Sequence, residues 1–161
     1  MTPRAAELVR TLALAPHPEG GYFAELFRSP RTVDPVDGRP LRSALTGVWF
    51  LLLAGQRSAW HRVDSDEIWL HFEGCDVRLW LYDAATGEIW SELLGPLAEE
   101  RSPQRIVPAG VWQAAEPLGD YSLTGAAVGP GFDFADFRMM ADEPTLRHDL
   151  TSRRPDLARL L

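Results

Sequence analysis

The segment from Gly55 to Gly74, GQRSAWHRVDSDEIWLHFEG, contains a histidine and a glutamate that could do chemistry together. His61 and Glu67 lie on either side of the polar turn Asp64-Ser65-Asp66, which can reverse or shift the chain so that both side chains reach one cavity. A neutral imidazole and a carboxylate can ligate a divalent metal or act as an acid and base pair. We predict that His61 and Glu67 are the catalytic residues.

Three side chains further along are predicted to bind a ligand in the same cavity. Trp69 shares strand parity with Glu67 and can form a stacking wall for a sugar or ring. Gln113 follows an expected tight turn, and its amide can hydrogen-bond a substrate but binds metal only weakly. His71 lies four residues beyond Glu67, an even separation that places it on the same strand face.

The segment HPEGGYFAELFRS, residues 17–29, supplies a fourth candidate, Arg28. Gly20 and Gly21 allow backbone angles closed to other residues, so the chain can turn sharply into an early strand. Arg28 can bind a carboxylate or phosphate of a ligand, or it can pair with Glu25 and clamp an exchanged strand in a dimer. Both roles for Arg28 remain open from the sequence.

Composition excludes several classes of function. The chain has no lysine, so Schiff-base chemistry and a phosphate-binding P-loop lysine are excluded. The 16 arginines against 23 acidic residues give a net charge of −7, which repels nucleic acid and anionic lipid. The apolar run from Gly47 to Gly55 is too short to span a bilayer. We expect a cytoplasmic protein with no nucleic-acid or membrane partner.

The pattern of residues predicts one domain over residues 1–161. Apolar residues at helical spacing predict a helix over about residues 3–14. Short β-branched and aromatic segments predict an all-β barrel core over about residues 20–140, with hairpins at EGCD and DAATGE in an antiparallel meander. Residues 142–161 return to helical character, and Pro155 is placed to begin a last short helix.

Several strands carry large apolar residues at both parities, which indicates that both sheet faces are covered. Either the terminal helices or a second copy of the chain can cover the outside, and we predict a homodimer that packs sheet against sheet. Trp60 and Trp112 are expected to point outward into that contact. In GPGFDFADF, residues 129–137, the phenylalanines are expected to close the barrel, with the aspartates capping turns or pairing with Arg138.

The spacing of these residues resembles the two signature motifs of the cupin superfamily. The intervals run Gly55-x5-His61-x-Val63-x3-Glu67-x6-Gly74 and then Pro108-x-Gly110-x2-Gln113. More narrowly, HPEGGYFAELFRS, AWHRVDSDEIW, VPAGVWQAA and GPGFDFADF resemble the uncharacterised Cupin_5-type domain of unknown function. The resemblance implies a double-stranded β-helix (jelly-roll) barrel, commonly dimeric, with an internal pocket. Val63 and Gln113 replace two histidine metal ligands of the superfamily.

Three functions follow from this reading. We predict a metal-independent isomerase or epimerase that acts on a sugar-like or small polar carbonyl compound, with no cofactor. The first alternative is a non-catalytic protein that binds a small molecule in the same pocket. The second is a metal-dependent oxygenase or isomerase, in which His61 and Glu67 would bind the ion together with Gln113 or His71.

Overall fold

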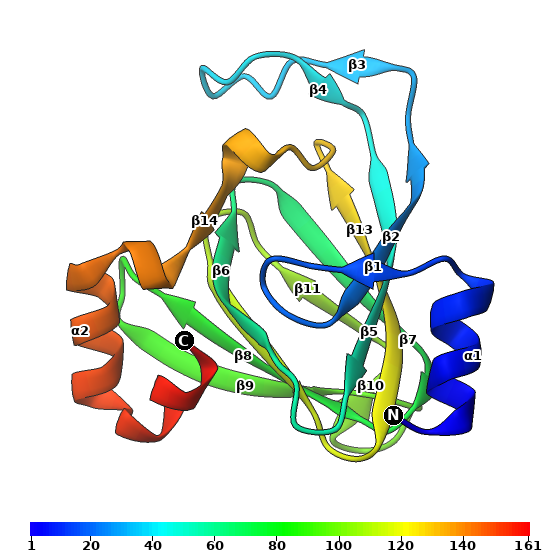
Figure 1. Ribbon diagram of the computed structural model, residues 1–161. Helices are drawn as coiled ribbons and strands as arrows, with labels where there is room; N and C mark the ends of the chain where they lie inside the picture. The colour runs from blue at the N-terminus through cyan, green and yellow to red at the C-terminus, as the bar shows by residue number, and fades with distance from the viewer.

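Two six-stranded sheets face one another and form a barrel in the computed structural model, which describes residues 1–161 (Figure 1). The first sheet has the order β1-β2-β5-β13-β7-β11, with bounds β1 Ala15–Pro16, β2 Tyr22–Arg28, β5 Thr46–Leu53, β13 Tyr121–Gly129, β7 Asp66–Gly74 and β11 Gln104–Val107. The second has the order β10-β9-β8-β12-β6-β14, with bounds β10 Arg101–Ser102, β9 Glu88–Leu94, β8 Val77–Asp83, β12 Trp112–Pro117, β6 Ser58–Val63 and β14 Phe137–Met139. This is the predicted all-β double-stranded β-helix, with flanking helices.

The chain crosses repeatedly from one sheet to the other. β6 lies in the second sheet, β7 in the first and β8 in the second again. The predicted hairpin at EGCD is therefore wrong, and the middle of the chain is not a meander. The hairpin at DAATGE is confirmed, because β8 pairs with β9 from Asp83 opposite Glu88 onward. A turn signal marks a change of direction and does not say which strand the next segment will pair with.

Helix α1 (Pro3–Thr11) covers one end of the outer face of the first sheet. Thr2 caps it by accepting a hydrogen bond from the backbone N–H of Ala5, and Pro3 occupies the first turn, where its missing N–H costs nothing. Leu8 packs against Leu51 of β5. The helix ends three residues earlier than predicted. None of the helices is long and apolar enough to cross a membrane.

The C-terminal tail covers the outer face of the second sheet. It comprises the short helices η2 (Met140–Asp142), α2 (Pro144–Arg153) and η3 (Pro155–Leu160), the last beginning at Pro155 as predicted. Trp60 and Trp112 point outward as expected, but both are 1% exposed because Leu157 and Leu160 of the same chain pack on them. The prediction that these tryptophans form a dimer contact is wrong, since the tail already buries them.

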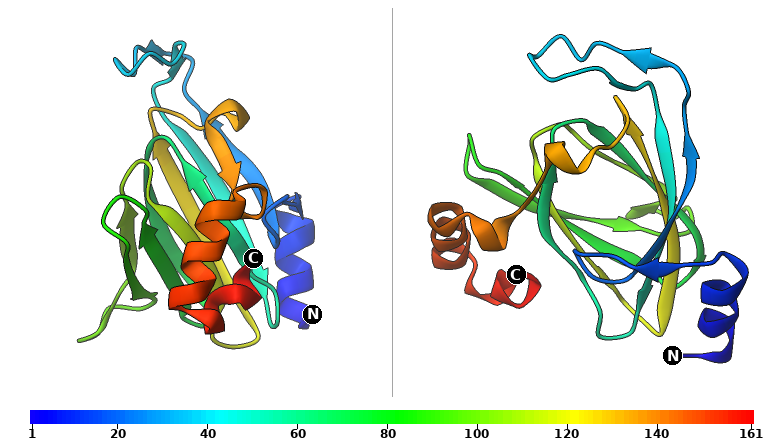
Figure 2. Two further views of the ribbon diagram at one scale, coloured as in Figure 1. Left: turned by 90° about the vertical axis from the view of Figure 1, so that its left-hand side faces the viewer. Right: turned by 45° about the horizontal axis from the view of Figure 1, so that its top comes forward.

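One end of the barrel is packed with side chains and the other is open. Leu52, Leu79, Leu81 and Leu94 fill the packed half together with other buried apolar residues. At the other end lies η1 (Phe134–Asp136), and the hairpin of β3 (Thr32–Val33) with β4 (Arg42–Ser43) projects beyond the barrel (Figure 2). The open half contains the cavity described next.

Candidate functional site

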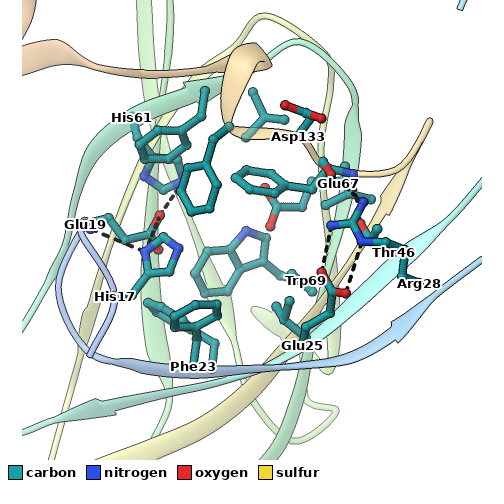
Figure 3. A pocket seen from close by; sticks show the side chains of 18 residues that line it. His17, Glu19, Phe23, Glu25, Arg28, Thr46, His61, Glu67, Trp69 and Asp133 are labelled. Atoms are coloured by element: carbon teal, nitrogen blue, oxygen red, sulfur yellow. Dashed lines mark hydrogen bonds and ion pairs between the residues drawn. The ribbon is translucent and has the colours of Figure 1, made fainter. Parts of the chain in front are cut away.

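A cavity of about 270 Å³ occupies the barrel interior at the η1 end. Strands β2, β5, β6, β7 and β13, the turn before β2 and the segment around η1 all contribute to its wall. The titratable side chains that line it are His17, Glu19, Glu25, Arg28, His61, Glu67 and Asp133. Figure 3 shows His17, Glu19 and His61 grouped at one side of the cavity and Glu25 with Arg28 at the other.

The turn before β2 carries His17 and Glu19 to the cavity wall. Its backbone is fixed to the start of β6 by the N–H of Ala59, which donates to the carbonyl oxygen of Glu19 at 2.7 Å. Gly20 has a φ of +108°, and a Cβ there would collide with the carbonyl oxygen of Arg57. Glycine at this position therefore lets the turn approach β6 closely enough to place both side chains inside the barrel.

His61 on β6 contacts Glu19 rather than forming a hydrogen bond with Glu67. Its Nδ1 donates to the carbonyl oxygen of Ala59 at 2.8 Å, and its Nε2 lies 3.3 Å from Glu19 Oε2. Because the Nδ1 proton is committed to a carbonyl, a neutral His61 presents a lone pair at Nε2. The contact with Glu19 thus needs one proton, held by either the carboxyl or the imidazole.

Burial controls the protonation of this pair. Glu19 is 8% exposed, and its burial raises its pKa to about 7, against smaller opposing effects of His17 and of the Ser58 hydroxyl that donates at 2.9 Å. Burial lowers the pKa of His61 and, with a weaker opposing effect of Glu19, that of His17. The two imidazoles are therefore held neutral and the carboxyl is held near half protonation at neutral pH.

Glu67 on β7 has one oxygen held by the protein and one that is free. Gln113 Nε2 donates to Glu67 Oε2 at 2.6 Å, and no protein group bonds Oε1, which faces the cavity. Gln113 Oε1 in turn accepts from Trp69 Nε1 at 2.8 Å, so the orientation of the amide is fixed. Burial raises the pKa of Glu67 to about 6, although the neighbouring His61 and the hydrogen bond from Gln113 act to lower it.

The other predicted ligand-binding residues lie in different places. Trp69 lines the cavity, whereas Gln113 is buried behind it and acts on it through Glu67 and Trp69. His71 does not line the cavity, because its Nε2 donates to the carbonyl oxygen of Cys75 at 3.1 Å near the end of β7. Arg28 lines the mouth and is held by other groups of the chain.

The segment around η1 forms one side of the cavity mouth. Phe132, Phe134 and Phe137 line the cavity, which agrees with the expected closure by these rings, although residues 134–136 form a 3-10 helix rather than a strand. Asp133 caps that helix by accepting from the N–H of Ala135 at 2.8 Å. Asp136 pairs with Arg42 at 2.7 Å. Of the two roles expected for these aspartates, capping is therefore confirmed at Asp133, and pairing with Arg138 is not seen.

Sequence reasoning missed His17 and Glu19. Both were available in HPEGG, where two titratable residues stand directly before a pair of glycines at a sharp turn. The signal that could have identified them is a pair of titratable residues in a turn that must approach another strand. The interpretation of this turn considered only its glycines. None of the three tyrosines lines the cavity, whereas Glu19 does.

The residues present do not fit a divalent metal site of the cupin type. Val63 has no donor atom, and both polar atoms of the Gln113 side chain are bonded to Glu67 and Trp69. Both nitrogens of His61 face other groups of the chain. No set of three or more His, Cys, Asp or Glu side chains is arranged to hold a metal ion. The predicted ligand set with His71 is not assembled in the cavity.

The fold and the buried cavity define a cupin barrel with an internal site. Residues 6–140 match the family described as Cupin_5, cupin superfamily (DUF985), and the chain belongs to this family. It is 28% identical over 158 residues to the uncharacterised protein YML079W of Saccharomyces cerevisiae, covering 88% of this chain and 78% of that protein.

Two solved structures share the fold over nearly their whole length. Protein SO0799 from Shewanella oneidensis superposes with a TM-score of 0.85 at 30% identity, covering 97% of this chain and 96% of that one. A hypothetical protein from Leishmania major superposes with a TM-score of 0.82 at 29% identity and the same coverage. The predicted membership of this cupin subfamily is therefore confirmed.

Proposed function

We propose that this cupin is a metal-independent isomerase or epimerase of a small polar carbonyl compound. The observation that carries the proposal is the pairing of two kinds of acid in one cavity: Glu67 with a free Oε1, and the Glu19 and His61 pair with one shared proton. A base and an acid with pKa values displaced toward neutrality are what proton transfer beside a carbonyl requires.

Each group has a definite role in this reaction. The Glu67 carboxylate removes the proton from the carbon beside the substrate carbonyl, and the electron pair of the broken C–H bond moves onto the carbonyl as an enolate. For epimerisation, the proton shared by Glu19 and His61 is delivered to the same carbon. For isomerisation of a hydroxycarbonyl compound, that proton goes to the carbonyl oxygen and gives an enediol; Glu67 then returns its proton to the former carbonyl carbon while the neighbouring hydroxyl proton passes back to the Glu19 and His61 pair. The substrate is neither oxidised nor reduced overall, so no cofactor is required.

Gln113 and Trp69 support this chemistry by holding the base. The Gln113 amide fixes Glu67 Oε2 and leaves Oε1 directed at the substrate, and the amide itself is oriented by the Trp69 indole N–H. A side chain locked in this way does not need to reorganise when the proton moves. Gln113 is therefore a positioning residue rather than one that contacts the substrate.

One observation favours the alternative of a non-catalytic binding protein. His61 has both nitrogens directed at the protein, toward Ala59 and Glu19, so it offers no free donor or acceptor to a ligand. If Glu19 also keeps its proton bound within the pair, the cavity would bind a carbonyl compound without turning it over. The two functions differ in one measurable property, exchange of the substrate proton with solvent.

The test is a screen of small sugars and carbonyl compounds in deuterated water, followed by NMR of the carbon beside the carbonyl. We expect deuterium uptake in at least one compound, reduced by about 100-fold or more in Glu67→Gln. Glu88→Gln, at an exposed position on β9, is the matched control and should behave as the native protein. Compounds that bind but exchange no proton would contradict catalysis, and unchanged exchange in Glu67→Gln would contradict the role of Glu67.

A further inference from the structure

The charges that line the cavity are not balanced. Four carboxyl groups face it, from the turn before β2, from β2 itself, from β7 and from the segment before η1, against a single guanidinium. The carboxyl groups belong to Glu19, Glu25, Glu67 and Asp133. Because His17 and His61 are held neutral by burial, they add no compensating positive charge.

The one guanidinium is already neutralised. Arg28 donates to both carboxylate oxygens of Glu25, through Nε at 3.0 Å and Nη2 at 2.7 Å, and its Nη1 donates to the carbonyl oxygen of Phe132 at 3.1 Å. This two-pronged pairing uses the flat edge with which arginine would otherwise bind an anionic ligand. Arg28 therefore does not offer the cavity a free positive charge.

Glu67 is the carboxyl group that most needs a positive partner. Its side chain is 92% buried, and its Oε1 faces the cavity without a hydrogen-bond partner in the protein. A largely buried carboxylate without a compensating charge is costly, since it has lost part of its hydration and receives one donor from the protein, Gln113. A ligand that brings a positive charge to Oε1 would supply the charged partner that the protein does not provide.

The apolar part of the wall also favours a cation. Six aromatic side chains line the cavity: Phe23, Phe50, Trp69, Phe132, Phe134 and Phe137. Aromatic faces attract ammonium groups, and cages of such rings recognise quaternary ammonium ligands. A volume of about 270 Å³ suits a small molecule of this kind.

We infer that the cavity selects a small organic cation, a protonated amine or quaternary ammonium group, held between Glu67 Oε1 and the aromatic wall. Resting on the proposed function, this narrows the substrate to a carbonyl compound that also carries such a group. A positive charge close to the reacting carbon also makes its C–H bond more acidic, which assists proton removal by Glu67.

The experiment compares ligands of equal shape and different charge by calorimetry with the full chain at about pH 8, where both imidazoles and Glu67 are fully deprotonated. The probes are choline, its uncharged isostere with carbon in place of the quaternary nitrogen, and acetate as an anion. We expect choline to bind at least about tenfold more tightly than its isostere, a difference of about 1.4 kcal/mol. Glu67→Gln should reduce that difference, and Glu88→Gln, matched in chemistry and exposed, should keep it.

Three outcomes would overturn the inference: equal binding of choline and its isostere, tighter binding of acetate than of choline, or an undiminished preference for choline in Glu67→Gln. Circular dichroism of each variant confirms that it is folded before the affinities are compared. The preference for a charged ligand is measured by binding alone, so this test does not depend on the proposed reaction. If neutral sugars exchange protons and the cavity shows no preference for cations, the cation inference is wrong but the proposed reaction stands. If cations bind and no compound exchanges a proton, the proposed reaction is wrong but the cation inference stands.

Discussion

Gln113 donates its side-chain N–H to Glu67 Oε2 at 2.6 Å, across the space between β12 and β7. The two strands belong to different sheets, so this hydrogen bond joins the two halves of the barrel beside the cavity. The same amide accepts from Trp69, which leaves neither of its polar atoms free. A position where the cupin superfamily is expected to have a metal ligand here holds the Glu67 carboxyl group by a hydrogen bond.

Replacing Gln113 with leucine should destabilise the folded protein strongly. The change leaves Trp69 Nε1 and Glu67 Oε2 buried without partners, and we expect the free energy of unfolding to fall by about 2 to 4 kcal/mol in urea denaturation. The pKa of Glu67 should also rise, because the Gln113 hydrogen bond acts to lower it. Gln104→Leu, at an exposed position on β11, is the control and should change the free energy of unfolding by less than about 0.5 kcal/mol. A similarly small change in Gln113→Leu would show that the hydrogen bonds joining Trp69, Gln113 and Glu67 do not stabilise the fold.

The proposed reaction requires a bell-shaped dependence on pH. Glu67 must be ionised, so the rate of proton exchange should rise as the pH passes about 6, the pKa to which burial raises this group. Glu19 and His61 must keep their shared proton, so the rate should fall as the pH passes about 7. Glu19→Gln removes the shared proton, so it should lower the rate and abolish the fall on the alkaline side. An exchange rate independent of pH between these limits would contradict both assignments.

The same carboxyl groups predict how stability depends on pH. Glu19 has a folded-state pKa of about 7 against 4.5 for its reference value, so the folded protein binds more protons than the unfolded chain between these pH values. Stability from this group is fully present below about pH 4.5 and is lost as the pH rises through about 7, by about 3 kcal/mol. Thermal or urea unfolding across this range should show a shallower loss in Glu19→Gln. An equal pH dependence in the two proteins would contradict the raised pKa.

The C-terminal tail should contribute a large part of the stability. Leu157→Ala removes a fully buried side chain from the surface that covers Trp60 and Trp112, and we expect a loss of about 2 to 5 kcal/mol. Leu97→Ala, at a position 82% exposed, is the matched control and should be near neutral. A loss below about 1 kcal/mol in Leu157→Ala would mean that the tail is not held by this packing.

The homodimer stays a prediction, and the tail restricts where it can form. Ile68, Phe72 and Ile106 are between 40% and 62% exposed, and Ile68 pairs with Ile106 on the outer face of the first sheet. If two copies pack sheet against sheet, Ile106→Asp should shift the protein to a monomer in size-exclusion chromatography. An unchanged elution volume for a dimeric native protein would place the contact elsewhere.

The barrel could be predicted from the sequence because its signals are local. Short apolar segments, turn residues and motif spacing each depend on a few neighbouring positions, and so do the two prolines that begin α1 and η3. The pairing of strands is a long-range property, and that is why EGCD was read as a hairpin although β7 and β8 join different sheets. Turn residues predict where the chain changes direction, but they do not predict which strand the following segment pairs with.

The same distinction explains the site. His61, Glu67 and Trp69 were predicted at the cavity because they lie within nine residues of one another at spacings that strand parity interprets. Glu19 reaches His61 from 42 positions away through a turn whose approach depends on Gly20. No pattern in the sequence joins these two residues, since only the folded barrel brings them together.

The most direct test of the central claim is an NMR titration of the glutamate side-chain carboxyl carbons in the free protein, with Glu19→Gln and Glu67→Gln used to assign the signals. We predict that two of these carboxyl groups titrate far above the reference value of 4.5, Glu67 near about 6 and Glu19 near about 7. If both instead titrate near 4.5, the cavity holds no base and no proton donor suited to neutral pH, and the proposed acid and base chemistry is wrong.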